Sequence, residues 1–318
     1  GTEAECEEAA KDFGGHALAL TLLGSYLRVV HAGDIRKRGE ISQLTDERKQ
    51  GAHARRVMES YEKWFEDKPE LDILCLMGLF DRPAIGGAIE ALRAEPAIAG
   101  LTEKLQKLSD ANWCFALESL REARLLALQD DAEPDTLDCH PLLRKHFGEQ
   151  LKTQNPEAWR AAHSRLYEYY KNSTKELPDT LEEMAPLFAA MAHGCQAERY
   201  QETLADVYVQ RIIRGRDFFL TKQFGAYGAD LSILSNFFVK LWDQFGGELS
   251  KGSKTDIISW VGFALRSQGR LAESIKLMLV SQKNYIKNGQ FIFASIETGN
   301  ISELFLSIGN LKQALKSA

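Results

Sequence analysis

The sequence lacks long apolar runs, and this argues against a membrane protein. No segment of the 318 residues approaches the roughly 20 consecutive apolar residues that a membrane-spanning helix needs. Its start also lacks the basic and then apolar pattern of a secretory signal. With 44% apolar and 26% charged residues, the composition is typical of a globular chain of about two domains. We expect a cytoplasmic protein with no membrane partner.

Cysteine is scarce, and its spacing gives no disulfide or metal pattern. The five cysteines include no C-x-x-C pair and are far apart: Cys6, Cys75, Cys114, Cys139 and Cys195. Cys75 lies in an apolar run and Cys114 follows Trp113, so we expect both to be small buried side chains. His140 and His146 point to different sides of one predicted helix and cannot share a metal ion. We expect a reducing environment and no metal site.

An excess of basic charge is also missing. The net charge is -6, whereas nucleic-acid binders need a basic surface to release counterions from phosphates. The charge is uneven, because residues 1–13 have a net charge of -4 and residues 36–56 a net charge of +4. The basic stretch is either a solvated linker or a docking surface for an acidic partner or a nucleotide-bearing domain.

Enzyme signatures are absent as well. Residues 247–254 have two glycines at the separation of a phosphate-binding loop, but they end in Ser253-Lys254 instead of lysine followed by a hydroxyl residue. They also follow a helical pattern at 237–245 rather than a strand, so we expect a loop between helices. No zinc-protease, serine-hydrolase or dinucleotide motif occurs. We expect no catalytic residue and no enzyme within these residues.

What the sequence has in abundance is helical periodicity. In the first 125 residues it predicts helices at 4–12, 16–30, 53–66, 69–80, 84–93, 102–109 and 115–125. Between 125 and 139, two short extended patterns flank the turn-rich residues 130–135, which predicts a β-hairpin. Helices followed by such a hairpin are typical of a winged-helix domain. From residue 156 to the end helix follows helix, which is typical of an α-solenoid.

An internal repeat supports the solenoid. Residues 264–277 align with 304–317 at a 40-residue offset, and the matched pairs are Gly269 and Gly309, Leu271 and Leu311, and Ser274 and Ala314. We expect the glycines and small residues to let two helices approach closely, with the leucines in the groove between them. The pattern resembles a tetratricopeptide repeat (TPR) with a period longer than the usual 34 residues.

A weaker third copy lies at 195–208. There Glu198 takes the glycine position and Tyr200 the leucine position. The alternative to a repeat is a set of ordinary helical hairpins that share Gly-x-Leu by chance. We expect an all-α fold with one small β-hairpin, in which a winged-helix domain precedes an α-solenoid of TPR-like helical hairpins.

Two motifs are candidates for ligand contact. The first is Gly14-Gly15-His16-Ala17, where paired glycines allow a tight turn just before a helix whose exposed N–H groups could face an anion. The second places His140 just before a helix and directly after the predicted hairpin, with Arg144 one turn along on the same side. A histidine there can donate to a phosphate or cap a backbone group.

In this order, the motifs resemble a known family. GGHALALTLLG (14–24) is similar to the GGLPLAL-type motif of STAND-class signalling NTPases, which include the NB-ARC proteins, and DCHPLLRKHFGEQL (138–151) resembles their MHD-type motif. SYEKWF (60–65) and ILCLMGLFDRPA (73–84) resemble the opening of the family's winged helix. The later segments 189–204, 211–220 and 299–315 resemble the helical and TPR sensor of bacterial members. The resemblance spans essentially the whole chain.

The resemblance implies roles for five residues: Gly14, Gly15, Ala17, His140 and Arg144. In the family, the glycine motif packs near the adenine and the MHD histidine approaches the β-phosphate of ADP. Gly15 and Ala17 would line the base, and His140 would sense the phosphate. Ala17 stands where the family has proline, and His140 is flanked by cysteine and proline instead of methionine and aspartate.

The resemblance also implies a domain order and a missing part. We expect residues 1–33 to be the end of a helical switch subdomain, 34–52 a linker, 53–152 the winged-helix domain, 153–250 a helical spacer and 251–318 TPR-like repeats. No P-loop is present and the sequence begins without methionine, so we expect part of a longer chain that has an N-terminal nucleotide-binding domain. ADP or ATP would bind only in that parent. An activating protein or small molecule would bind the repeats.

Two other functions remain open. A free-standing TPR-like scaffold for protein interactions would need no nucleotide. A winged-helix regulator of DNA is the other, but the acidic charge and the few basic residues near the predicted helices (Arg93, Arg121 and Arg124) argue against a nucleic-acid partner.

Overall fold

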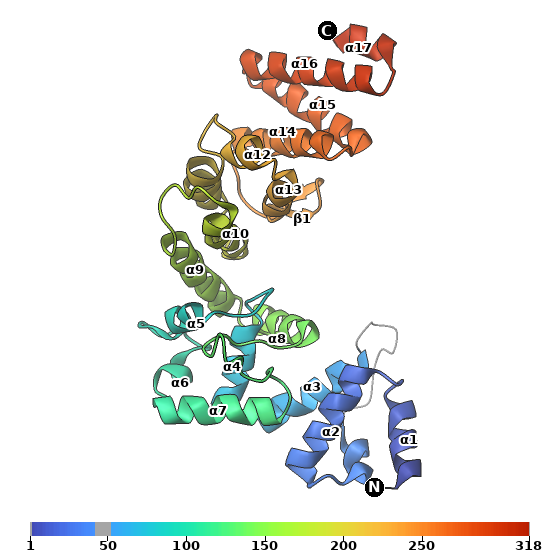
Figure 1. The fold of residues 1–318 in the computed structure, drawn as a ribbon, viewed down its shortest axis with the longest axis vertical. Coiled ribbons are helices and arrows are strands. Elements are labelled where there is room, and N and C mark those ends of the chain that lie inside the picture. The colour runs from blue at the N-terminus through green and yellow to red at the C-terminus, as the bar shows by residue number, and fades with distance from the viewer. Residues whose placement is uncertain (1, 42–51, 318) are drawn as a thin grey trace. The chain divides into compact units, whose positions relative to one another are not determined.

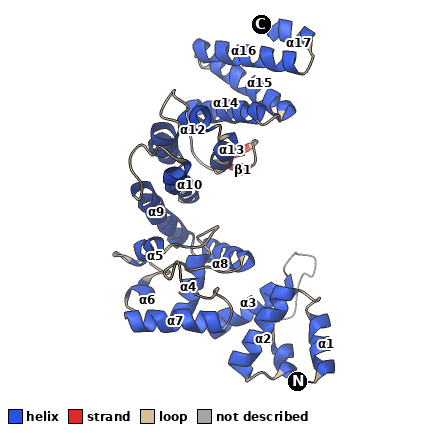
Figure 2. Cartoon of the chain, viewed as in Figure 1, coloured by secondary structure: helices blue, strands red, loops and turns tan. Residues whose placement is uncertain are grey.

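The computed structural model describes residues 2–41 and 52–317, and it is helical almost throughout (Figure 2). The chain divides into two compact units, residues 1–162 and 163–318. The expected fold class, all-α with a small hairpin and helical repeats, is confirmed, although the hairpin lies elsewhere in the chain. None of the helices formed by the described residues combines the length and the apolarity that a bilayer crossing requires.

Unit 1 is a set of short helices around two local cores (Figure 1). In chain order they are α1 (Glu3–Asp12), α2 (Ala17–His31), the 3-10 helix η1 (Ile35–Glu40), α3 (Ala52–Trp64), α4 (Pro69–Met77), α5 (Gly86–Arg93), α6 (Glu103–Gln106), α7 (Asp110–Glu122) and α8 (Pro141–Gln154). Helix α2 packs on α3, whereas α4 packs on α6, α7 and α8. Helix α9 (Pro156–Asn172) contains the boundary with unit 2.

The basic stretch after α2 finds an acidic partner inside the chain. On η1, the Arg38 side chain donates to Glu8 at 2.7 Å and to Asp12 at 3.0 Å, and both acids lie on α1. Arg38 itself is half-buried. Part of the positive charge at 36–56 is therefore a docking surface for α1 of the same chain, while Arg48 and Lys49 lie outside the described residues.

Residues 125–139 do not form the predicted β-hairpin. They contribute only an isolated bridge between Leu137 and Ala84, and one hydrogen bond from the Ala127 amide to the Asp138 carbonyl at 2.8 Å. The reason is that Leu137 pairs with a residue far away in the sequence, before α5. The acidic residues 130–135 are exposed and bond locally instead, as the Ala132 amide does to Asp130.

The hairpin occurs in unit 2, where the sequence predicts a helix. Unit 2 contains α10 (Leu181–Gln196), α11 (Tyr200–Glu202), the π-helix η2 (Thr203–Ile212), α12 (Phe219–Phe224), α13 (Tyr227–Ser235), β1 (Phe238–Lys240), β2 (Gln244–Phe245), α14 (Lys251–Ser267), α15 (Leu271–Lys287), α16 (Phe291–Ser307) and α17 (Leu311–Ser317). The rings of Phe238 and Phe245 stack at 4.4 Å across the antiparallel pair β1–β2. Residues 250–254 then cap and begin α14, and Gly247 packs against the Tyr200 ring.

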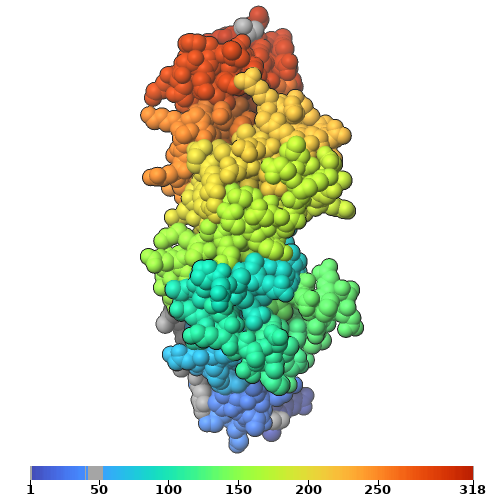
Figure 3. Space-filling model, turned by 90° about the vertical axis from the view of Figure 1, so that its left-hand side faces the viewer, coloured from blue at the N-terminus to red at the C-terminus, as the bar shows by residue number. Residues whose placement is uncertain are grey.

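The last four helices form a regular array with a period of 20 residues. Helices α14 to α17 begin at residues 251, 271, 291 and 311, and each packs on the next, in chain order (Figures 1 and 3). Gly269, Gly289 and Gly309 adopt φ of 75°, 70° and 75° in the turns between them. Each turn is closed by the amide that follows the glycine, which donates to a carbonyl five residues earlier at 2.8–2.9 Å. The 40-residue repeat is thus two of these units.

The predicted repeat is present, but the expected packing reasons are partly wrong. A Cβ on Gly269 or Gly309 would meet no atom within 4 Å, so these glycines are needed for their left-handed φ and not for close approach. Leu311 is 62% exposed and fills no groove. Ser274 and Ala314 are buried as expected, and the Ser274 hydroxyl donates to the Gly262 carbonyl at 2.7 Å.

The weaker third copy has the same turn. Glu198, at the glycine position, has φ of 63°, and the Arg199 amide donates to the Gly194 carbonyl at 2.9 Å. Thr203 occupies the small-residue position and is fully buried. The sequence alignment therefore located a turn geometry that even a non-glycine residue adopts.

Candidate functional site

The paired glycines form the tight corner that the sequence predicts. Gly14 and Gly15 have φ of 59° and 65° between α1 and α2, and the side chain of His16 then caps α2 by accepting from the Ala19 amide at 3.3 Å. The amides of Gly14 and Gly15 donate to α1 carbonyls at 3.0 and 2.8 Å. The glycine N–H groups are therefore used within the chain, so they cannot also face a ligand.

Ala17 lies at the exposed start of α2. Within the described residues no acceptor takes its amide or that of Leu18, since the first capped amide is that of Ala19. These are the two helix-start donors that the corner offers to an anion or to the edge of a base.

The start of α3 stands against this corner. A Cβ on Gly14 would lie 2.9 Å from Nε2 of His53, and the Arg56 guanidinium lies 4.7 Å from the centre of the Phe13 ring. The sequence analysis did not single out His53 or Arg56. Their spacing of three, which puts them on one face of a helix that starts within the basic stretch, is the signal that could have identified them.

His140 caps α8 and keeps one ring nitrogen available. Its side chain is exposed, and its Nδ1 accepts from the Leu142 amide at 3.1 Å. A neutral imidazole that accepts at Nδ1 has its proton on Nε2, so Nε2–H is a donor. Among the described residues the structure gives Nε2 no acceptor. The geometry thus allows His140 both of the roles that the sequence suggests, the backbone cap and the phosphate donor.

Arg144 is buried and bonded within unit 1. Only 6% of it is exposed, and its guanidinium donates to the carbonyl of Cys139 at 3.2 Å, to the carbonyl of Arg82 and to the carboxylate of Asp138. These contacts attach α8 to the segment before it and to the loop after α4. In this arrangement Arg144 positions the chain around His140, and its donors are already occupied.

Helix α3 lies between the two motifs. His53 near its start contacts Gly14, while Glu62 near its end binds His146 and accepts from Gln150 at 3.0 Å, and both of these lie on α8. At a rise of about 1.5 Å per residue, the two contact points on α3 are roughly 14 Å apart. The motifs are therefore not one preformed site in unit 1, and α3 is the physical connection between them.

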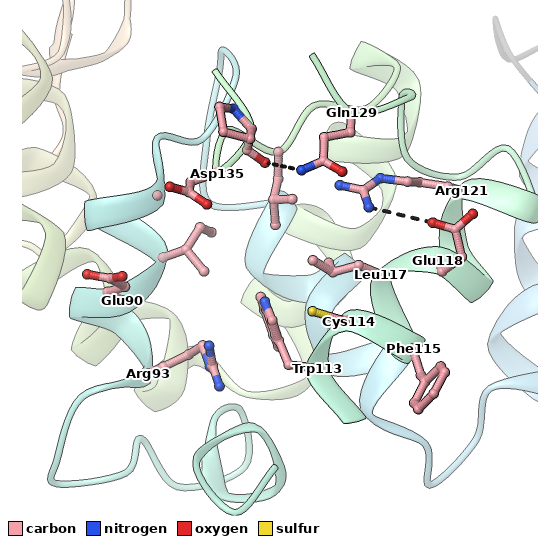
Figure 4. Close-up of a pocket in the computed structure, with 14 residues that line it drawn as sticks. Glu90, Arg93, Trp113, Cys114, Phe115, Leu117, Glu118, Arg121, Gln129 and Asp135 are labelled. Atoms are coloured by element: carbon pink, nitrogen blue, oxygen red, sulfur yellow. Dashed lines mark hydrogen bonds and ion pairs between the residues drawn. The ribbon is translucent and has the colours of Figure 1, made fainter. Parts of the chain in front are cut away.

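A separate pocket lies between α5, α7 and residues 129–137 (Figure 4). Its volume is about 480 Å³. It is lined by Gly86, Ile89, Glu90, Arg93, Trp113, Cys114, Phe115, Leu117, Glu118, Arg121, Gln129, Pro134, Asp135 and Leu137. Cys114 is exposed here, so the prediction that it is a buried core residue is wrong. Its place on α7 turns it toward the pocket and not toward α4.

Two arginines of the predicted winged helix also line this pocket. The Arg93 guanidinium lies 4.0 Å from the centre of the Trp113 ring, and burial lowers the pKa of Arg93. Arg121 is 11% exposed and lies 3.7 Å from the carboxylate of Glu118. These side chains line a cavity instead of forming an exposed basic surface of the kind that DNA requires.

Comparisons with known proteins give one distant likeness. No family model matches the sequence, and no curated protein matches it. Among solved structures, the chain is similar to a Signal Transduction ATPase with Numerous Domains (STAND) protein with a tetratricopeptide repeat sensor from Pyrococcus horikoshii. The two are 15% identical, with a TM-score of 0.36, over 98% of this chain and 50% of that chain. This chain spans half the length of the solved one.

Proposed function

We propose that this chain is the regulatory and sensing portion of a STAND-type signalling ATPase. Unit 1 helps to hold an ADP-bound resting state, and the helical repeats of unit 2 sense an activating protein or small molecule. The observation that carries this proposal is the geometry of His140, in a motif that resembles the family's phosphate sensor. Its Nδ1 is committed to the α8 cap, and its Nε2–H remains a donor at an exposed position.

In this proposal a β-phosphate oxygen of ADP accepts from Nε2 of His140. A hydrogen bond to a charged acceptor contributes about 1.5–3 kcal/mol. Arg144 supports this contact indirectly, because it fixes the segment before α8 through Cys139 and Asp138. The exposed amides at the start of α2 would meet the nucleotide from the other motif.

The nucleotide-binding domain itself is not among these residues. Phosphate binding and magnesium coordination in such ATPases depend on a P-loop and on acidic residues that follow it. We propose that a domain N-terminal to this chain supplies them, and that this chain alone neither hydrolyses ATP nor holds nucleotide tightly.

The repeats suit the sensing role because they present helix faces at a fixed spacing. Stacked helical units create extended surfaces whose exposed residues can differ while the turns stay the same. An activator that binds the repeats more tightly in one arrangement of the protein shifts the equilibrium toward that arrangement. Release of ADP would follow from the loss of the His140 contact.

The test is ADP retention by the protein that includes the N-terminal nucleotide-binding domain. His140→Ala is expected to weaken ADP binding roughly 10- to 150-fold, which corresponds to the loss of one charge-assisted hydrogen bond. His140→Asn separates the two roles, because the asparagine oxygen can still cap α8 while the ring donor is lost. Unchanged ADP affinity in both variants would exclude His140 as the phosphate contact.

A free-standing TPR-like scaffold is the alternative, and one observation favours it. The repeat helices and their turns expose large apolar side chains, among them Ile286, Phe291, Ile292, Ile296, Leu306, Ile308, Leu311 and Leu315. Such residues are typical of a surface that binds other proteins. The reading frame upstream of residue 1 separates the two functions, because a P-loop encoded there supports the ATPase and a start codon there supports the scaffold.

A further inference from the structure

The pocket of unit 1 carries charges of opposite sign on its two sides (Figure 4). Glu90 on α5 and Asp135 of the 129–137 segment lie on one side. Arg121 of α7 and Gln129 lie on the other side. Trp113 and Leu117 lie between them, so the two polar sides are separated by an apolar stretch.

Each of the two arginines has a donor that the protein leaves unused. The Nε atoms of Arg93 and Arg121 are buried, and within the described residues neither has a hydrogen-bond acceptor. A buried donor without an acceptor is costly, so most such groups in proteins are paired. Arg144 and Arg211 show how this chain normally treats a buried arginine, since each guanidinium donates to several carbonyl oxygens.

The orphaned donors indicate the shape of the missing group. A carboxylate has two oxygens and can accept from Nε and a terminal nitrogen of the same guanidinium. Glu118 does not fill this role at Arg121, because it approaches only the terminal nitrogen, at 3.7 Å. Gln129 holds its place beside Arg121 by donating to the Pro134 carbonyl at 3.1 Å.

The acidic side is held in place by a close backbone approach. A Cβ on Gly86 would lie 2.6 Å from Cβ of Asp135, so only glycine lets this segment pack against the start of α5. Glu90 lies one turn further along α5. The two carboxylates stand where they could accept from an ammonium group.

We propose that this pocket binds a small zwitterion of dipeptide size with an apolar side chain. Its carboxylate binds Arg121 and is attracted by Arg93, its ammonium group binds Glu90 and Asp135, and its side chain packs on Trp113 and Leu117. The volume of about 480 Å³ lies within the range of sites for small molecules. This site uses none of the residues assigned to nucleotide contact, so it stands independently of the proposed function.

The test uses alanyl-phenylalanine, its N-acetyl derivative and its C-terminal amide as probes. Calorimetry with the intact chain is expected to give a dissociation constant of about 0.1–1 mM for the free dipeptide. Both derivatives are expected to bind at least about tenfold more weakly, because each lacks one charge. Equal binding of the acetylated probe would overturn the zwitterion, and absence of binding by the free dipeptide would overturn the proposal.

Cys114 reports whether the probe occupies this pocket. Its alkylation, followed by mass spectrometry of the α7 peptide, is expected to slow in proportion to bound dipeptide. Cys6 on α1 is also exposed but lies outside the pocket, so its alkylation rate is the internal reference and stays constant. Binding without protection of Cys114 would place the dipeptide elsewhere and reject the site.

Variants complete the test. Arg121→Gln and Arg93→Gln are each expected to weaken dipeptide binding about tenfold or more, whereas Arg124→Gln, an exposed arginine that does not line the pocket, leaves it unchanged. The buried cysteines Cys139 and Cys195 remain unreactive in a folded variant, which identifies any loss that comes from misfolding. Unweakened binding in the two folded pocket variants contradicts the assignment.

Discussion

Gly78 and Gly148 bring the backbones of α4 and α8 into direct contact. A Cβ on Gly78 would lie 2.3 Å from the amide nitrogen of Gly148, and a Cβ on Gly148 would lie 2.6 Å from the carbonyl oxygen of Gly78. No side chain larger than hydrogen fits on either helix at this crossing. Since His140 begins α8, this contact sets the position of the candidate phosphate sensor relative to the rest of unit 1.

The first prediction follows from this crossing. Gly78→Ala and Gly148→Ala are each expected to lower the free energy of unfolding by about 1–3 kcal/mol, because backbone atoms must move to admit a methyl group. Gly24→Ala is the matched control, since Gly24 lies on an exposed face of α2 with no atom near its Cβ position. That substitution is expected to stabilise α2 by about 0.5–1 kcal/mol. Urea unfolding measures all three, and equal effects would refute the crossing.

A second prediction concerns the turns of the repeats. Gly289→Ala is expected to destabilise the array by about 1–2 kcal/mol, because alanine is disfavoured at φ of 70° even though the space is open. Gly299→Ala, within α16 and equally open, is expected to be stabilising by about 0.5–1 kcal/mol. Thermal unfolding of the two variants should therefore move in opposite directions. A shift in the same direction would mean that φ is not what requires the glycine.

The third prediction assigns Arg144 a positioning role. Arg144→Ala is expected to cost about 1–3 kcal/mol of stability, because the carbonyls of Arg82 and Cys139 lose their donor. Amide exchange at residues 137–139 is expected to accelerate in the same variant. The neighbouring Lys145 is 64% exposed, and Lys145→Ala is expected to change stability by less than about 0.5 kcal/mol. Unaltered exchange at 137–139 in Arg144→Ala would show that the segment is held by other contacts.

The fourth prediction is a pH dependence in unit 2. Burial raises the pKa of Asp230 to about 6 from its ordinary 3.8, although the Tyr208 hydroxyl donates to it at 2.8 Å. Between these two pKa values the folded chain keeps a proton that the unfolded chain releases, so stability falls as the pH rises through this window. The loss at pH 7 amounts to about 3 kcal/mol.

Asp230→Asn tests this dependence, because the asparagine oxygen can still accept from Tyr208 but does not ionise. Relative to wild type, the variant is expected to gain stability steadily from pH 4 to pH 6 and to show no further gain above about pH 7. Urea unfolding at several pH values gives the difference. A constant difference across the range would mean that Asp230 titrates normally.

Much of the fold follows from local sequence, and the helices are the clearest case. The alternation of apolar residues located α1 to α4, and Gly14-Gly15 located the first corner, because helical periodicity and left-handed turns are local properties. The 20-residue period was not seen in the sequence. Around Gly289 the flanking residues differ from those around Gly269 and Gly309, so the shared turn is visible only in its φ angles and hydrogen bonds.

The hairpins show where local reasoning fails. Leu137 pairs with Ala84, and a partner 53 residues away leaves no trace in the pattern of residues 125–139. In residues 237–245, the apolar residues fit a helical face equally well as a strand, and the stacking of Phe238 on Phe245 decides in favour of the hairpin.

The candidate site divides in the same way. The capping position of His140 follows from the Pro141 that comes after it, which is a local signal for the start of a helix. The burial of Arg144 does not follow from its position on α8, because one of its acceptors is the carbonyl of Arg82, in the loop after α4. The pocket around Trp113 likewise assembles three separate segments, and no motif in the sequence marks it.

The 20-residue spacing of the repeat helices restricts which changes in chain length the array can accept. One residue inserted into a helix of the array rotates everything after it by about 100° about the helix axis. Ser274, Ala294 and Ala314, the small side chains buried at the same place in successive helices, would then turn away from their neighbours. Substitutions on the exposed faces leave this alignment intact. Descendants of this sequence should therefore differ freely in surface residues, and gain or lose length in whole helical units.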